Sequence, residues 1–266
     1  MKKLIALLLA VVMVCAFAAC TNTPATESTA PSTEATTPST EATTDGVKVM
    51  THADFIAAEL DTKVTVETYV QATQGWWEQD GQGKTTLYTQ AEDGAYFMYS
   101  INCDKETYEK LKTPGTKIRV VGYKAEYKGE VEIIDAESLE VLEGTWTATA
   151  TDVTAELASE DLIKHQNEFV SFKGMPVEPI KNKEGVESAF LYNWDGSGED
   201  GNDLYFNVSV DGKTYNFTVE SYLTGKGTDV YEAVKALKVG DKIDMEGFLY
   251  WYDGVNPHIT SVKPVA

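Results

Sequence analysis

The sequence is poor in the residues that most often carry out chemistry. Its 266 residues include three cysteines and three histidines, and Arg119 is its one arginine. His52, His165 and His258 lie far apart and form no metal-ligand spacing. The sequence also contains no nucleophile elbow, phosphate-binding loop or paired-carboxylate motif. We therefore expect that the chain is not an enzyme and that it needs no cofactor.

Positive charge is scarce as well. The chain has 22 Lys and Arg residues against 42 Asp and Glu residues, which gives a formal net charge of -20. A surface this acidic repels phosphate backbones and anionic lipid, so the composition disfavours nucleic acid as a partner. The same charge also keeps a secreted protein from aggregating, and that explanation requires no partner.

Long apolar runs are missing apart from one near the N-terminus, from Leu4 to Val14, which is too short to span a bilayer. Lys2 and Lys3 precede this run and Phe17-Ala18-Ala19-Cys20 follows it, which is the layout of a signal peptide over residues 1–19. The end of the segment resembles a bacterial lipobox. The resemblance implies that Cys20 carries acyl chains such as palmitate and becomes the first residue of the mature protein. An ordinary secretory signal cut before Cys20 is the alternative.

Cysteine is then nearly absent from the mature chain. Cys15 would leave with the signal and Cys20 would be acylated, so Cys103 is the remaining thiol and no disulfide is expected. Cys103 follows the apolar run at 96–101, where a lone cysteine is more often a small buried residue than a nucleophile.

Residues 20–46 have almost no apolar surface to bury. Thr, Ser, Pro, Ala and Glu dominate this segment, and Pro-Ser-Thr-Glu-Ala-Thr-Thr occurs at 31–37 and again at 38–44. Such a composition predicts a disordered tether. We therefore expect a lipid-anchored protein on the extracytoplasmic side of the cell membrane, as in many Gram-positive lipoproteins.

What the chain does contain is an internal duplication. Residues 115–134 form an apolar strand with Gly122 in its middle, a turn at Lys128-Gly129 and a second apolar strand. Residues 240–259 repeat this pattern, with Gly247 in the strand and Asp253-Gly254 in the turn. Each copy predicts a β-hairpin whose first strand bends sharply at its glycine.

The duplication extends to two whole domains. Leu87-Tyr88 recurs as Leu204-Tyr205, and both copies read as three strands, a helix and two strands. Thr51 and Asp104 are predicted N-caps for a short opening helix and for the helix after the third strand. We place the first domain at 47–144, a linker at 145–156 and the second domain at 157–266.

Five short strands with a helix between the third and the fourth is the order of an OB-fold, a small Greek-key barrel. The segments Val-Thr-Val-Glu-Thr-Tyr-Val at 64–70 and Pro-Gly-Thr-Lys-Ile at 114–118 resemble bacterial OB-fold domains of extracytoplasmic proteins and lipoproteins. The resemblance implies a mostly β chain with two tandem OB-fold-like five-stranded barrels, each with a short opening helix, after the tether. It also implies binding rather than a reaction.

OB-folds bind ligands on the face of strands 2 and 3, between the loops that join strands 1 to 2 and 4 to 5. Those loops are expected to carry six aromatic residues, which are Trp76, Trp77, Tyr127, Trp194, Trp251 and Tyr252. Aromatic rings flanked by Asp, Asn and Gln suit stacking on flat ligands, including sugar rings. The alternative is that these rings close the barrel ends as part of the core.

The loop at 195–203 is acidic and rich in glycine. Its carboxylates, Asp195, Glu199, Asp200 and Asp203, are candidate calcium ligands. However, Asp200 stands where an EF-hand loop requires glycine, and the loop lacks a glutamate at the twelfth position. An exposed hairpin loop is therefore favoured, with calcium as the minor alternative and no other metal expected.

These observations lead us to expect a membrane-anchored binding lipoprotein. It would capture an oligosaccharide or another small extracellular ligand through the aromatic loops of its two barrels. An alternative is a structural or protein-interaction lipoprotein of the cell envelope. Nucleic-acid binding is a third hypothesis, which rests on the fold and is opposed by the charge.

Overall fold

A computed structural model of the chain describes residues 43–44 and 47–265. The described residues belong to one compact unit. The predicted signal peptide, the lipid-accepting Cys20 and nearly all of the tether lie outside the described residues. Within the described ranges, no helix is both long enough and apolar enough to cross a membrane.

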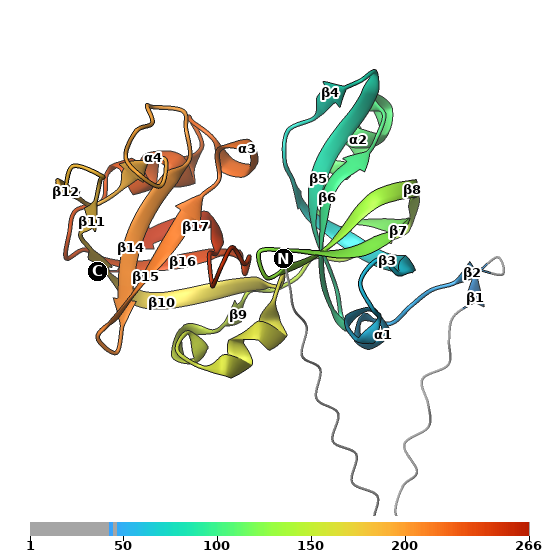
Figure 1. Cartoon of the computed structure of the whole chain (residues 1–266), viewed down its shortest axis with the longest axis horizontal. Coiled ribbons are helices and arrows are strands. Elements are labelled where there is room, and N and C mark those ends of the chain that lie inside the picture. Colours follow the sequence, from blue (N-terminus) through green and yellow to red (C-terminus); the bar gives the residue numbers. More distant parts are fainter. Residues whose placement is uncertain (1–42, 45–46, 266) are drawn as a thin grey trace, which may run out of the picture. The chain divides into compact units, whose positions relative to one another are not determined.

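The first barrel, coloured cyan to green in Figure 1, follows a short antiparallel pair, β1 (Thr43–Thr44) and β2 (Val47–Lys48). Its elements in chain order are α1 (His52–Ala57), β3 (Lys63–Thr73), β4 (Trp77–Gln79), β5 (Gln82–Ala91), β6 (Gly94–Asn102), α2 (Lys105–Leu111), β7 (Thr116–Tyr127) and β8 (Glu130–Thr145). The sheet runs in the order β3-β7-β8-β6-β5-β4. Because β3 also pairs with β5, the sheet closes into a barrel.

The second barrel, coloured yellow to red, repeats this plan with more short elements (Figure 1). Its elements are β9 (Thr151–Asp152), η1 (Thr154–Glu156), η2 (Glu160–His165), β10 (Phe169–Glu178), β11 (Ile180–Lys181), β12 (Glu187–Ser188), β13 (Leu191–Tyr192), β14 (Leu204–Val210), β15 (Lys213–Val219), α3 (Ser221–Thr224), α4 (Asp229–Lys235), β16 (Lys242–Phe248) and β17 (His258–Pro264). The sheet order is β13-β14-β15-β17-β16-β10-β9, and β10 also pairs with β14.

Both barrels have the same circular strand order. Strands 1 to 5 are β3, β5, β6, β7 and β8 in the first barrel and β10, β14, β15, β16 and β17 in the second. In each barrel strand 3 pairs with strand 5 in parallel, and the other pairs of this set are antiparallel. This is the five-stranded Greek-key barrel of the OB-fold, so the predicted tandem architecture is confirmed. The range predicted as linker contains β9 and η1, and β9 pairs with β10.

The helices begin at the predicted caps. The side chain of Thr51 accepts the backbone N–H of Asp54, and Asp104 accepts that of Thr107 at 2.7 Å. Each cap satisfies an N–H group that has no partner within its helix. The opening helix of the second barrel is the 3₁₀ helix η2, which Ser159 caps in the same way.

The duplicated mid-strand glycines are needed for close approach between strands. A Cβ atom at Gly122 would lie 2.9 Å from the carbonyl oxygen of Ile134, and one at Gly247 would lie 2.2 Å from that of His258. The pairing of strands 4 and 5 shifts register beside both glycines. Glycine therefore lets strand 4 bend against strand 5 in each barrel, as the sequence predicts.

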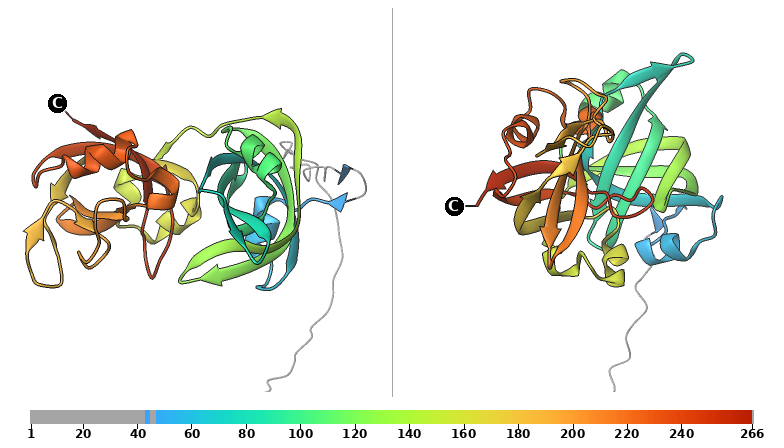
Figure 2. Two further views of the ribbon diagram at one scale, coloured as in Figure 1. Left: turned by 90° about the horizontal axis from the view of Figure 1, so that it is seen from above. Right: turned by 60° about the vertical axis from the view of Figure 1, so that its left-hand side comes forward.

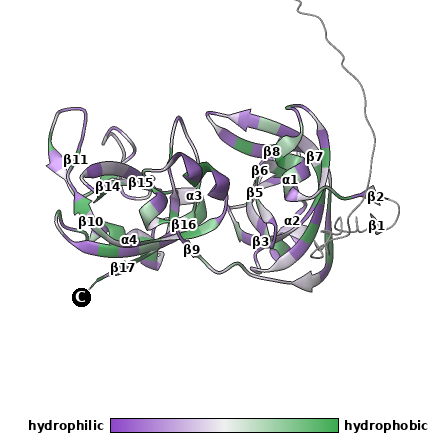
Figure 3. Cartoon of the chain, turned by 90° about the horizontal axis from the view of Figure 1, so that it is seen from below, coloured by the Kyte–Doolittle hydropathy of each residue, from purple (hydrophilic) through white to green (hydrophobic). Residues whose placement is uncertain are grey.

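Each barrel wraps around its own apolar core (Figure 2). Along the strands, hydrophobic residues alternate with hydrophilic ones, as the colours of Figure 3 show. In the first core Phe55 of α1 packs edge-on against Tyr96 at 5.1 Å between ring centroids. In the second core Phe172 packs edge-on against Phe217 at 4.7 Å. The opening helix thus covers the first core directly.

A third apolar cluster joins the two barrels, and we call it the inter-barrel cluster. Tyr88 and Phe97, from strands 2 and 3 of the first barrel, pack against Phe248 of the second, and all three side chains are buried. Tyr88 stacks on Phe248 with ring centroids 4.6 Å apart. The hydroxyl of Tyr88 also lies 2.7 Å from Nδ1 of the buried His258. The barrels therefore share a packed interface with a hydrogen bond inside it.

The two turns that the duplication makes equivalent lie against each other. Tyr127 and Tyr252 meet edge-on at 6.0 Å, and Nζ of Lys128 lies 2.8 Å from Oδ2 of Asp253. The backbone N–H of Asp253 also donates to the carbonyl of Lys128 at 2.8 Å. Because the ion pair is exposed, we expect it to contribute little to stability, and the backbone hydrogen bond fixes the two turns more firmly.

Glu130, at the start of β8, is fully buried where the second barrel covers it. Its Oε2 accepts the backbone N–H of Trp251 at 2.9 Å and the Nε2–H of Gln166 at 3.4 Å. Its Oε1 has no hydrogen-bond partner among the described residues. Burial raises the pKa of Glu130 to about 8, so this carboxyl group is mostly protonated at neutral pH.

Candidate functional site

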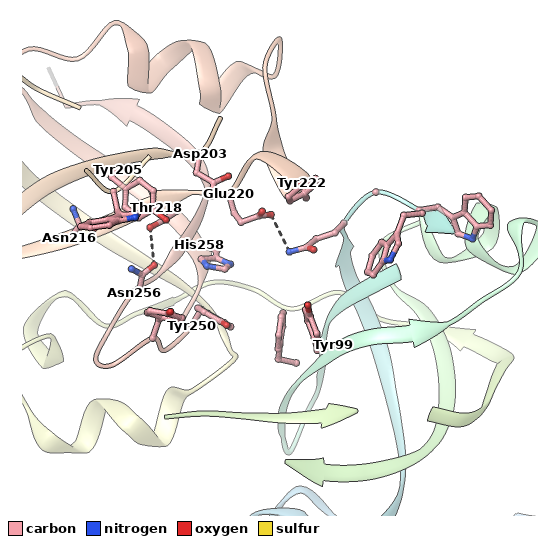
Figure 4. A pocket seen from close by; sticks show the side chains of 17 residues that line it. Tyr99, Asp203, Tyr205, Asn216, Thr218, Glu220, Tyr222, Tyr250, Asn256 and His258 are labelled. Atoms are coloured by element: carbon pink, nitrogen blue, oxygen red, sulfur yellow. Dashed lines mark hydrogen bonds between the residues drawn. The ribbon is translucent and has the colours of Figure 1, made fainter. Parts of the chain in front are cut away.

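A pocket of about 1210 Å³ opens on the face where OB-folds bind ligands. Its inner wall is formed by strands 2 and 3 of the second barrel, β14 and β15, and by the loop between β16 and β17. The opposite wall comes from the first barrel, from residues 74–77 and from β6 (Figure 4). The pocket therefore lies on the face of the second barrel that corresponds to the OB-fold binding face, and the first barrel closes it on one side.

Nine aromatic side chains line this pocket: Trp76, Trp77, Phe97, Tyr99, Trp194, Tyr205, Tyr222, Tyr250 and Tyr252. Several of them hold their rings in solvent, since Trp194 is 74% exposed and Tyr222 is 75% exposed. Exposed rings at the rim of a concave site are natural stacking surfaces for a flat ligand.

The deep end of the pocket is built from a stacked pair of rings. Tyr250 lies over His258 with centroids 4.2 Å apart and 26° between the ring planes. Burial lowers the pKa of His258 to about 3, so the imidazole is neutral at physiological pH. Nε2 of Gln74 donates to the hydroxyl oxygen of Tyr88 at 3.2 Å, and the same hydroxyl lies 2.7 Å from Nδ1 of His258. In the tautomer that pairs with a donating Tyr88 hydroxyl, the proton of His258 is on Nε2.

The polar groups of the pocket are carboxylates and amides. Oε2 of Glu220 accepts Nε2–H of Gln74 at 3.1 Å, and this contact joins the two barrels across the pocket (Figure 4). Burial and the neighbouring charge of Asp203 raise the pKa of Glu220 to about 7. Thr218 Oγ1 donates to Oδ1 of Asn256 at 2.9 Å, which leaves the amide N–H groups of Asn256 available.

Positive side chains do not contribute to this site. No lysine or arginine is among the pocket-lining residues of the described chain. The pocket therefore offers ring faces and hydrogen-bond acceptors but no cation for a phosphate group.

Of the six predicted ligand-binding aromatics, the structure brings Trp76, Trp77, Trp194 and Tyr252 together in this pocket. Trp76 is also part of the barrel, because its indole N–H donates to the carbonyl of Cys103 at 2.9 Å and its ring packs on the first core.

The other two predicted aromatics lie elsewhere. Trp251 packs against the second core and lines a separate pocket of about 580 Å³ beside η2. Tyr127 lies in the contact between the two turns and is 53% exposed. Trp251 and Tyr252 are adjacent in sequence, and they face different pockets.

Sequence reasoning missed several residues of the pocket, namely Tyr99, Tyr205, Tyr222, Tyr250 and His258. A signal existed for two of them. Tyr250 directly precedes the Trp-Tyr pair at 251–252, and Tyr205 is the repeat counterpart of Tyr88. Tyr99 and His258 had no such signal, because the packing of the barrels brings them into the pocket.

The acidic loop at 195–203 has local partners. Asp200 pairs with Lys226 at 2.7 Å and with Lys235 at 2.9 Å. Oδ1 of Asp195 accepts the N–H of Ser197, as in an ordinary turn. Across residues 43–44 and 47–265, no group of three or more His, Cys, Asp or Glu side chains could hold a metal ion.

Cys103 has the environment of a structural residue. It is buried in the first core, and its Sγ–H donates to the carbonyl of Asp104 at 3.2 Å. Burial raises the pKa of its thiol to about 11, so the thiolate needed for nucleophilic attack is rare at neutral pH.

No protein-family model and no curated protein matches this chain. Several solved structures are similar to it in fold. One is the p204 HINb domain, with 13% identity over 78% of this chain and 100% of that chain and a TM-score of 0.36. Another is the Ifi202 HINa domain in complex with 20 bp dsDNA, with 12% identity over 77% and 97% and a TM-score of 0.32. A third is a Replication Protein A heterotrimer bound to ssDNA, with 12% identity over 77% of this chain and 49% of that chain and a TM-score of 0.35.

These comparisons correct two of our predictions. We expected a module that captures an oligosaccharide or small extracellular ligand, with an envelope protein-interaction subunit as the alternative, and we disfavoured nucleic acid. The similar structures include proteins bound to single-stranded and double-stranded DNA instead. At these identities the likeness is one of fold, so the ligand must be argued from this chain's own residues.

Proposed function

We propose that this protein binds single-stranded nucleic acid by stacking unpaired bases in the aromatic pocket of its second barrel. The observation that supports this is the set of nine aromatic side chains that line the pocket, five from the second barrel and four from the first. Base stacking on aromatic side chains contributes about 1–3 kcal/mol per base in sequence-tolerant single-strand binding.

The composition of the pocket favours unpaired bases over a duplex. A duplex buries the faces of its bases and presents its phosphates, and this pocket provides no lysine or arginine to meet them. A single strand can place its bases on the rings and leave its phosphates in solvent. Physiological salt screens the repulsion from the acidic surface beyond about 8 Å.

The proposal predicts that exposed rings of the pocket carry binding energy. Trp194→Ala and Tyr222→Ala should each weaken binding of a fluorescein-labelled single strand by about 1–3 kcal/mol for each lost stack. Fluorescence anisotropy measures this affinity directly. Trp194 is 74% exposed and Tyr222 is 75% exposed. Removing either side chain should therefore leave folding unaffected.

Leu60→Ala is the control, because this large side chain is 52% exposed and lies outside the pocket. Its affinity should equal that of the parent protein.

Repeating the titration at rising salt tests the same site in another way. Since no cation lines the pocket, affinity should stay level or rise with salt, whereas phosphate-driven binding falls steeply. Equal affinity in all three variants would contradict the proposed site.

We further propose that the protein acts at the outer side of the cell membrane, attached through Cys20. The support is the Phe-Ala-Ala-Cys segment at 17–20 after a short apolar run. Cys20→Ser should release the protein from the membrane fraction, and immunoblots of fractionated cells measure this. Cys103→Ser is the control, because it changes a cysteine that the lipobox does not involve. Membrane retention of the Cys20 variant at the parent level would refute the anchor.

A further inference from the structure

We infer that the aromatic pocket prefers guanine over the other bases. This inference rests on the proposed function and gives that site a base preference. It follows from the hydrogen-bonding groups that the pocket leaves open between its rings. Those groups combine carboxylate acceptors with neutral N–H donors.

The acceptors are two neighbouring carboxylates at the start of α3. Asp203 accepts the backbone N–H of Ser221 at 2.8 Å and its hydroxyl at 2.6 Å, both on Oδ1. Oε2 of Glu220 accepts the Nε2–H of Gln74 and the backbone N–H of Leu223. Oδ2 of Asp203 therefore receives no hydrogen bond from the described residues, and Oε1 of Glu220 receives none from a side chain. Both residues line the pocket, where their labels mark them in Figure 4.

The donor is a buried imidazole. His258 is 8% exposed, and its Nδ1 is occupied by the hydroxyl of Tyr88. Nε2 then carries the proton, and it has no partner among the described residues. Because His258 lines the pocket, a base that lies beside the edge of its ring, close to the imidazole plane, can accept this N–H. Asn256 adds amide N–H groups beside it, since its Oδ1 is held by Thr218.

Guanine is the base that matches this set. Its Watson–Crick edge has two adjacent donors, N1–H and the 2-amino group, which the open oxygens of Asp203 and Glu220 can accept, one each. Its O6 and N7 atoms are acceptors for N–H groups. Adenine and cytosine each have one amino group beside a ring-nitrogen acceptor, and thymine has one ring N–H between two carbonyl groups, so none of them places two donors side by side on that edge.

The same chemistry explains how an acidic pocket can suit a polyanion. Asp203, together with Glu220 where it is ionised, repels phosphates and accepts hydrogen bonds from the edge of a base. A site of this kind places the base inside and keeps the backbone outside. The polar groups of the pocket thus contribute selectivity, and its aromatic rings contribute stacking energy.

The test uses short labelled oligothymidylates that carry guanine, hypoxanthine or adenine at one central position. Hypoxanthine differs from guanine by the missing 2-amino group. We expect the guanine strand to bind about tenfold or more tightly than the hypoxanthine strand, as for a hydrogen bond to a charged acceptor. Anisotropy titrations of the purified protein give the three affinities.

Asp203→Asn and Glu220→Gln replace a carboxylate by an amide that can still accept the local hydrogen bonds. At least one of them should abolish the preference for guanine over hypoxanthine. Asp211→Asn is the matched control, since Asp211 is exposed in the β14–β15 turn and outside the pocket, and it should keep the preference. Equal binding of all three strands to the parent protein would overturn the guanine preference and leave the proposed function standing. Failure of every strand to bind would overturn both.

Discussion

Tyr88→Ala is expected to lower the free energy of unfolding by about 3–5 kcal/mol, which is the usual cost of deleting a large buried aromatic ring. Tyr88 is 2% exposed, and its ring contacts Phe97 at 5.1 Å and Phe248 at 4.6 Å. Removing it would open a cavity between the barrels and leave Nδ1 of His258 without its partner. Urea denaturation followed by tryptophan fluorescence measures the change.

Two further variants separate packing from hydrogen bonding at this position. Tyr88→Phe keeps the stacked ring but leaves Nδ1 of the buried His258 unpaired, and should cost about 1–3 kcal/mol. Tyr99→Ala, two residues beyond Phe97 on β6, removes a side chain that is 52% exposed. It should change stability by at most about 0.5 kcal/mol. If Tyr88→Ala is no more costly than Tyr99→Ala, the inter-barrel cluster does not hold the barrels together.

Glu130→Gln is expected to stabilise the protein at alkaline pH by about 2–4 kcal/mol and to have little effect near pH 5. The pKa of Glu130 is raised from 4.5 to about 8 in the folded state, chiefly by burial. As pH rises from 4.5 to 8, the unfolded chain gives up this proton readily while the folded chain retains it. The carboxyl group therefore costs stability increasingly over this range and costs most above pH 8.

Glutamine resembles protonated glutamate in size and charge, so the variant should lose this part of the pH dependence. Its oxygen can still accept the N–H of Trp251. Thermal melts of both proteins from pH 5 to pH 9 give the comparison. Glu126→Gln, an exposed change four residues earlier, should melt in parallel with the parent protein. A stability difference for Glu130→Gln that stays constant across the pH range would refute the raised pKa.

Much of the fold could be predicted because its signals are local. Gly122 and Gly247 mark bends where a Cβ atom would meet backbone, and the structure confirms those bends. Thr51 and Asp104 cap helices through contacts within three residues. Turn and cap chemistry of this kind depends on neighbours in the sequence, so a single sequence reveals it.

The binding pocket was harder to predict because it depends on contacts between residues far apart in the chain. The repeat suggested that the aromatic loops of both barrels contact the ligand. In the structure Tyr127 packs at a turn and Trp251 packs on a core. Gln74 and Glu220 meet across 146 positions of sequence. No local pattern encodes such a pairing, because it is decided by how one barrel covers the other.

The inter-barrel cluster has a consequence for how many ligands one chain can hold. Tyr88 pairs across the strands with Phe97, and its repeat counterpart Tyr205 pairs with Thr218 at the equivalent place in the second barrel. In the first copy this surface is buried under Phe248, and in the second it lines the open pocket. The equivalent surfaces of the two barrels thus differ in burial, and under the proposed function the second barrel's surface is the one that binds the ligand. We therefore expect one chain to bind one ligand molecule at saturation, although it contains two barrels.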